Sequence, residues 1–115
     1  MERSTQRFCV LEYRSSGVSP ADSLVGNALI LVVEDHGEGL RFSVSPRLST
    51  IVAESDLPYI RDLLADFPEL SRSDPTSLFE GLCSLTVGPL VAQRVGTIEA
   101  DAEYIEQCCS GFLPL

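Results

Sequence analysis

The sequence contains no lysine and no tryptophan, and it has one histidine and one methionine. All eight basic residues are arginine. Without lysine the chain can form neither a Walker A phosphate loop nor a pyridoxal Schiff base, and it has no lysine general base. These enzyme classes are therefore excluded.

The chain has four cysteines, at Cys9, Cys83, Cys108 and Cys109, and none of them belongs to a C-x-x-C pair. One histidine cannot complete a Cys2His2 set, so we expect no structural zinc site. Cys9 and Cys83 stand within apolar patterns, which predicts core packing. The adjacent pair Cys108 and Cys109 could form a redox pair. Buried packing is the favoured interpretation, because free cysteine is usually buried.

Long hydrophobic segments are also missing. No apolar run approaches the roughly 18–20 residues needed to cross a bilayer. Residues 1–6 are polar and lead directly into a predicted strand, unlike a signal peptide. We therefore expect a soluble, cytoplasmic protein without membrane contact, with a flexible segment at residues 1–6. The length of 115 residues predicts a single globular domain over residues 1–115.

Acidic residues outnumber basic ones by 17 to 8, which gives a net charge of −9. A field of this sign repels phosphate backbones, so nucleic-acid binding is not expected. The acids are scattered rather than gathered in runs, which argues against a DNA mimic. The expected partners are therefore proteins.

Residues 27–33 (Asn-Ala-Leu-Ile-Leu-Val-Val) form the longest apolar run, and their length and β-branching predict a strand. Because neither face of this run is polar, both faces must be covered, which places it in the middle of a sheet. A first strand is predicted at residues 8–14. Residues 35–39 form a turn, and the alternating residues 40–45 complete a β-hairpin with it.

Three helices are expected after the hairpin. Ser45-Pro46 is typical of a helix start and predicts a short helix to about residue 53. A second helix begins at Ser55 or Asp56 and is expected to stop at Pro68, because proline disfavours a helical conformation in the preceding residue. Asp74-Pro75 repeats the cap-and-proline pattern for a third helix, with apolar residues facing inward at Leu78, Phe79, Leu82, Cys83 and Leu85.

The C-terminal part predicts one more strand and one more helix. Residues 90–98 are rich in strand-forming types, and Gly96 indicates a bulge or a close backbone approach. A helix is expected over residues 101–109, ended by a left-handed turn at Gly111.

The order of predicted elements is β-β-β-α-α-α-β-α. This order predicts an α+β fold, a mainly antiparallel sheet with helices packed on one face. Two coverings are possible for the second face of the sheet. One is a second copy of the chain, which would make a homodimer. The other is the last helix together with residues 111–115.

The turn at Asp35, His36 and Glu38 is the first candidate for chemistry. An Asp–His acid/base pair or a weak divalent-metal site could form there. The favoured alternative is a solvated turn, because an exposed loop tip lacks the water exclusion and the supporting contacts that catalysis requires. We therefore assign no catalytic, cofactor-binding or metal-binding residue.

Arginines are the second candidate. Arg41, Arg47 and Arg94 could meet on the exposed face of the sheet and bind a carboxylate or phosphate. The alternative is that they pair with the surplus of acids, as surface arginines commonly do.

Tyr13, the run Leu24-Val25-Gly26-Asn27-Ala28-Leu29-Ile30-Leu31 and the later Gly88-Pro89-Leu90 together resemble a bacterial family of unknown function. Its domains begin with a strand ending in Tyr, followed by Gly-Glu-x-x-Asn-x-Gly-Val-x-Leu. The Gly-Glu pair is missing here, and Leu29 stands where the family has Gly. The resemblance implies a bacterial setting and no mechanism.

The leading functional hypothesis is a non-enzymatic protein–protein interaction module that self-associates through its sheet, without a cofactor. It follows from the two-sided apolar strand and from the lack of a convergent polar site. One alternative is a small metal-dependent hydrolase centred on Asp35, His36 and Glu38. Another is a protein that binds small anionic ligands through Arg41 and Arg94.

Overall fold

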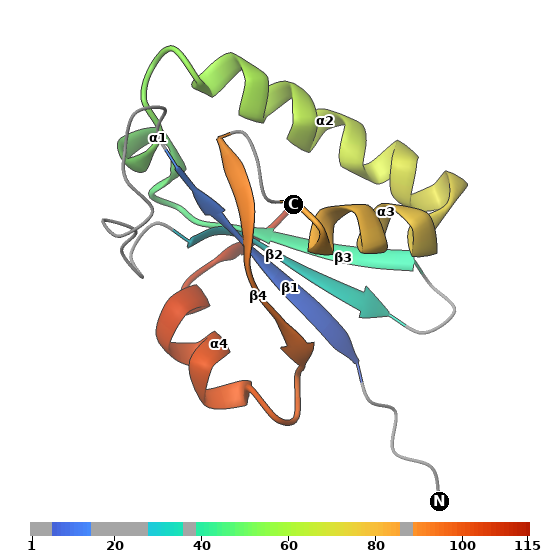
Figure 1. Cartoon of the computed structure of the whole chain (residues 1–115). Coiled ribbons are helices and arrows are strands. Elements are labelled where there is room, and N and C mark those ends of the chain that lie inside the picture. The colour runs from blue at the N-terminus through green and yellow to red at the C-terminus, as the bar shows by residue number, and fades with distance from the viewer. Residues whose placement is uncertain (1–5, 15–27, 36–38, 86–88) are drawn as a thin grey trace, which may run out of the picture.

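A five-stranded antiparallel sheet forms the centre of the molecule (Figure 1). The computed structural model describes residues 6–14, 28–35, 39–85 and 89–115. The strands follow the spatial order β4-β1-β2-β3-β5. Their bounds are β1 Arg7–Tyr13, β2 Ala28–Asp35, β3 Gly39–Val44, β4 Leu90–Thr97 and β5 Leu113–Pro114. The helices are α1 Leu48–Ile51, α2 Leu57–Ser73, α3 Pro75–Cys83 and α4 Ala102–Cys109. The α+β prediction and the order of its eight elements are confirmed, and β5 is added to them.

Strand β2 occupies the middle position of the sheet, with two strands on each side. It pairs with β1 through Leu31 opposite Val10, and with β3 through Val32 opposite Phe42. Residues 28–33 are all buried except Leu31, which is half-buried. The predicted central strand is therefore confirmed from Ala28 onward, and Asn27 lies outside the described residues.

The first face of the sheet is covered by α1, α2 and α3, as predicted. Phe67 of α2 and Phe79 of α3 are buried against Ile30 and Val32 of β2. The Phe67 ring stacks on Phe42 of β3, with ring centroids 4.6 Å apart and planes inclined by 13°. This cluster is the larger of the two cores.

The second face of the sheet is covered by α4, which lies on the side opposite α2 and α3 (Figure 1). Phe8 and Val10 of β1 pack there with Cys109. Tyr104, Ile105, Cys108 and Phe112 pack against the same cluster. Of the two coverings left open by the sequence, the last helix covers this face, and of residues 111–115 only Phe112 packs there.

Helix α2 does not stop at Pro68, and that prediction is wrong. The helix continues to Ser73 with Pro68 in its interior. Proline disfavours a helical conformation only in the residue before it. Here the tertiary packing of the residues on both sides of Pro68 outweighs that local effect. Phe67 is fully buried, and the hydroxyl of buried Ser71 accepts a hydrogen bond from the Leu40 N–H at 3.0 Å. These contacts fix the last turn of α2 over the edge of β3.

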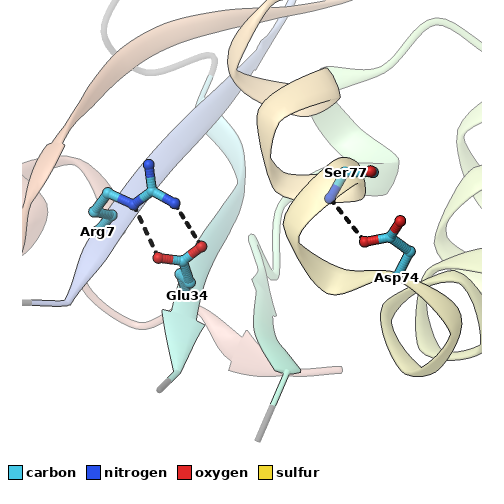
Figure 2. A network of polar contacts seen from close by, with 4 residues as sticks. All are labelled: Arg7, Glu34, Asp74 and Ser77. Atoms are coloured by element: carbon cyan, nitrogen blue, oxygen red, sulfur yellow. Dashed lines mark hydrogen bonds and ion pairs between the residues drawn. The ribbon is translucent and has the colours of Figure 1, made fainter. Parts of the chain in front are cut away.

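Of the two helix starts predicted at Ser45 and Asp74, only the one at Asp74 is found in the structure. Ser45 accepts a hydrogen bond from the Arg47 N–H at 3.2 Å, but this forms a turn, and α1 begins only at Leu48. Asp74 does cap α3, and its carboxylate accepts the Ser77 N–H at 3.1 Å (Figure 2). This hydrogen bond lowers the pKa of Asp74, because it favours the charged form.

The C-terminal elements explain both predicted special glycines. The pairing of β1 with β4 shifts register between Val10 and Leu11, so the bulge does not lie at Gly96. A Cβ at Gly96 would instead collide with the side-chain carboxylate of Asp101, so a side chain and not the backbone makes the close approach. Gly111 has φ +84°, the left-handed conformation expected after a helix.

Strand β5 was not predicted. Its two residues pair with Ser43 and Val44 at the outer edge of β3, and the Leu115 N–H donates to the Phe42 carbonyl at 2.9 Å. Within the described ranges, no helix combines the length and the apolar character needed to span a membrane.

Candidate functional site

The predicted acid and histidine site falls largely outside the described part of the chain. Asp35 is the last residue of β2 and pairs with Gly39 across the hairpin, which confirms the hairpin. His36 and Glu38 lie outside the described residues. Among residues 6–14, 28–35, 39–85 and 89–115, no group of three His, Cys, Asp or Glu side chains could hold a metal ion.

The predicted meeting of Arg41, Arg47 and Arg94 is wrong. Arg41 lies on β3 and Arg94 on β4, and both β1 and β2 run between them. Arg47 precedes α1. Arg94 binds the carboxylate of Asp101 at 2.6 Å, and its guanidinium lies 4.7 Å from the ring centroid of Tyr104. For Arg94 the ion-pair alternative is therefore the correct one.

A second ion pair, between an arginine and a glutamate, joins the first two strands to α3. Arg7 of β1 donates two hydrogen bonds to the carboxylate of Glu34 on β2, at 2.9 and 2.6 Å (Figure 2). These bonds raise the pKa of Arg7. The guanidinium also lies 5.0 Å from the ring centroid of Phe79. The contacts link β1, β2 and α3, which is a structural role.

Burial suppresses the reactivity of three of the four cysteines: Cys9, Cys83 and Cys109. Burial raises the pKa of Cys9 and of Cys83, and the two thiols are hydrogen-bonded to each other. Burial, with neighbouring Cys108, raises the pKa of Cys109 to about 12. These three thiols are therefore protonated at neutral pH and are poor nucleophiles. The predicted packing of Cys9 and Cys83 is confirmed, since Cys9 is buried in the first core and the partly buried Cys83 packs against it.

Other buried polar groups at the end of β1 also serve the fold. The Tyr13 hydroxyl donates to Asp56 at 2.5 Å and accepts the Ala53 N–H at 3.2 Å, which ties β1 to the start of α2. The buried carboxylate of Glu12 accepts a hydrogen bond from Arg14 at 3.1 Å. The Tyr13 contacts connect two elements of the fold, which is a structural role.

The feature with the clearest binding character is a groove between α2 and α3, which we call the α2/α3 groove. Its volume is about 190 Å³. The ring of Tyr59 is 54% exposed at its margin, and Leu82 is buried beneath it. The complete lining is Tyr59, Leu63, Ser77, Leu78, Gly81, Leu82, Leu85 and Leu90.

Helical spacing explains how the sequence builds this groove. Tyr59 and Leu63 are four residues apart and therefore lie on one face of α2. Leu78, Leu82 and Leu85 recur at the same kind of spacing along and beyond α3. Gly81 lies among them, and a Cβ there would meet no atom within 4 Å. The missing side chain leaves the α3 wall of the groove open.

The margin of the α2/α3 groove on α2 is acidic. Asp62 lies three residues after Tyr59, and Asp66 three residues after Leu63, so each carboxylate neighbours a groove residue on the helix surface. Both aspartates are exposed. The groove therefore combines an apolar lining with nearby negative charge, in a chain of net charge −9.

Sequence reasoning placed part of this groove in the core. Leu78 and Leu85 were expected to face inward, and they are half-buried. The sequence did hold one signal for a second apolar surface on the third helix. Its apolar residues cover an arc wider than the one face that packs on the sheet, and they are residues 78, 79, 82, 83 and 85. Tyr59 was not identified.

Comparisons with protein-family models, with curated proteins and with solved structures each found no match. The resemblance to a bacterial family through Tyr13 and the second strand therefore stays a prediction.

Proposed function

We propose that the chain is a non-enzymatic protein–protein interaction module whose α2/α3 groove binds an amphipathic, positively charged helical segment of another protein. The observation that carries the proposal is an apolar groove between two helices, with the Tyr59 ring half exposed at its margin. Amphipathic helices commonly bind such grooves by their apolar side chains. Tyrosine is also enriched among the residues that dominate binding energy at interfaces.

The negative charge beside the α2/α3 groove indicates which kind of partner segment it binds. Asp62 and Asp66 lie beside the apolar lining, and the whole chain carries an excess of nine negative charges. Lysine or arginine on the polar side of a bound helix would be attracted to these carboxylates, whereas an acidic segment would be repelled. The expected partner segment therefore has leucine-like anchors on one face and basic residues on the other.

A peptide titration tests the groove directly. The probe is a synthetic amphipathic helix of leucine and lysine, followed by NMR of the ¹⁵N-labelled protein. We expect the largest shift changes at Tyr59, Leu63, Leu78 and Gly81. Gly81→Arg should weaken binding about tenfold or more, because it fills the groove and adds repulsive charge. Gly81→Ala is the matched control and should bind normally, with a gain in stability of about 0.5–1 kcal/mol from removing a helical glycine.

Two further peptides give the outcomes that would contradict the proposal. One has the same composition in scrambled order, and the other replaces every lysine by glutamate. Equal binding of all three peptides would show adsorption instead of recognition. Shift changes that centre on α4, or that persist in Gly81→Arg, would place the binding surface elsewhere.

Self-association stays a prediction. Helix α4 already covers the sheet face that a second copy was expected to cover, so a homodimer would have to use another surface, such as the α2/α3 groove. Light scattering during size-exclusion chromatography distinguishes a second copy of the chain from a different protein as the occupant of the groove. A dimer that Gly81→Arg dissociates would identify a second copy in the groove. The cytoplasmic, bacterial setting stays a proposal from the sequence.

A further inference from the structure

The two edges of the sheet differ in how easily a further strand could pair with them. At the β3 edge, the Leu40 N–H donates to the Ser71 hydroxyl at 3.0 Å, and β5 pairs with Ser43 and Val44. Strand β5 has two residues, one of which is Pro114, and proline lacks the N–H that a further strand would bind. Short edge strands and edge prolines discourage pairing with other chains. This edge therefore resists the addition of a strand.

The other edge is the outer side of β4, a strand of eight residues without proline. The direction of its backbone groups follows from its pairing with β1. The Ile98 N–H donates to the Gln6 carbonyl, and the register continues from this pair along β4. In an antiparallel pair every second residue bonds the neighbouring strand. The N–H and C=O groups of Val95 and Thr97 therefore point away from β1.

The outward groups of β4 are bound near both ends of the strand and unpaired in its middle. The Ala92 N–H donates to the Leu85 carbonyl at 2.8 Å, and the Thr97 carbonyl accepts the Asp101 N–H at 3.1 Å. Between them, no group in the described part of the chain bonds the N–H or C=O of Val95 from the outer side. The Val95 side chain is 50% exposed. The middle of this edge therefore offers a strand-binding surface.

A carboxylate oxygen lies beside this open stretch, on the face of the sheet that α4 covers. Gly96 is opposite Phe8, a residue of the second core. Since Gly96 has no side chain, the Asp101 carboxylate occupies the space beside it. Oδ1 of Asp101 binds Arg94 at 2.6 Å, whereas Oδ2 is the oxygen nearest to Gly96. A lysine or arginine opposite Gly96 on an added strand would therefore be placed to bind Oδ2.

The net charge of −9 indicates the same kind of partner. It repels a second copy of the chain and attracts a basic segment. On the other face of the sheet, the exposed Val95 side chain would pack against a β-branched residue opposite it, as cross-strand neighbours commonly do.

We propose that the outer edge of β4 binds an extended, basic segment of another protein, which pairs antiparallel with it as an additional strand. A basic residue of the segment lies opposite Gly96, and a β-branched residue lies opposite Val95. This surface is on a different part of the molecule from the α2/α3 groove, and the inference does not depend on the function proposed for that groove.

The test begins with hydrogen exchange and an NMR titration of the ¹⁵N-labelled chain. The probe is the blocked peptide Thr-Val-Lys-Val-Thr. We expect the Val95 amide to exchange rapidly in the free chain and more slowly with the peptide at millimolar concentration. The largest shift changes should lie at Val95, Gly96 and Thr97.

Two matched peptides separate strand pairing from adsorption. In one, both valine nitrogens are methylated, which removes the N–H groups that would face β4. In the other, glutamate replaces lysine, which places a negative charge beside Asp101. Each should bind at least about tenfold more weakly than the parent peptide.

Variants at Val95 connect the binding to the edge. Val95→Pro removes the outward N–H and should weaken binding about tenfold or more, whereas Val95→Ala keeps the N–H and should retain most of the affinity. Proline is tolerated at an edge position whose N–H faces outward, and circular dichroism verifies the fold. The methylated peptide tests the same hydrogen bonds in the unaltered chain.

Five outcomes would overturn the proposal. They are slow exchange of the free Val95 amide, absence of peptide binding, equal binding of the methylated peptide, unchanged binding in Val95→Pro, and shift changes centred on the α2/α3 groove. A dimer of the chain alone that Val95→Pro dissociates would also overturn it, because the edge would then belong to a second copy.

Discussion

Replacing Phe67 by alanine should lower the free energy of unfolding by about 3–5 kcal/mol, the usual cost of emptying a buried aromatic site. Phe67 is fully buried under the first face of the sheet and stacks on Phe42 at 4.6 Å. Its removal leaves a cavity between α2 and β3 and takes away the packing that opposes the helix-breaking tendency of Pro68. Urea denaturation followed by circular dichroism measures the loss.

Leu70→Ala is the matched control for Phe67→Ala. Leu70 lies in the same helix, three residues further on, and is 45% exposed. Its truncation should cost about 1 kcal/mol or less, as is usual for surface positions. Equal losses in the two variants would mean that α2 does not pack on the sheet through Phe67.

Replacing Phe8 by alanine should have an effect of similar size, about 3–5 kcal/mol, on the other face. Phe8 is fully buried, and it packs in the second core with Val10 and Cys109. The loss is expected in the isolated chain, since α4 supplies the cover. Urea denaturation at low protein concentration is the appropriate measurement, because it excludes any contribution from a second copy.

Val95→Ala is the exposed control for Phe8→Ala, on the neighbouring strand. Val95 lies on edge strand β4 and is 50% exposed, so its truncation should cost about 1 kcal/mol or less. If Phe8→Ala lowered the free energy of unfolding by no more than Val95→Ala, the second face would be exposed to solvent in the free chain. The covering role of α4 would then be wrong.

Local signals in the sequence were sufficient for the central strand, the hairpin and the start of α3. Residues 28–33 are apolar on both sides, and only a sheet interior satisfies such a strand. Asp74-Pro75 places a capping carboxylate and a fixed proline dihedral at neighbouring positions, so the helix start is determined within a few residues. These features depend little on distant parts of the chain.

The features that could not be predicted depend on distant contacts. Pro68 disfavours helix locally, yet Phe67 and Ser71 on either side of it are held by β3, a strand more than twenty residues earlier in the chain. Once the helix was expected to end at Pro68, the contact of Ser71 with Leu40 of β3 could not be predicted.

Strand β5 illustrates the same limit. It has two residues, one of which is proline, and it pairs only with Ser43 and Val44. Nothing in so short a segment indicates a strand, because its pairing partner decides its conformation. The α2/α3 groove was missed for a related reason, since apolar residues such as Leu78 are equally suited to a core and to a groove.

The central claim is that one chain covers both faces of β2, which leaves the α2/α3 groove available to a partner. Hydrogen exchange at the β2 amides of Ile30, Val32 and Val33, measured by NMR at micromolar and near-millimolar protein concentration, tests it most directly. We expect these amides to be among the slowest to exchange and to exchange at the same rate in both samples. Rapid exchange, or protection that increases with protein concentration, would contradict it, because the cover would then come from another copy.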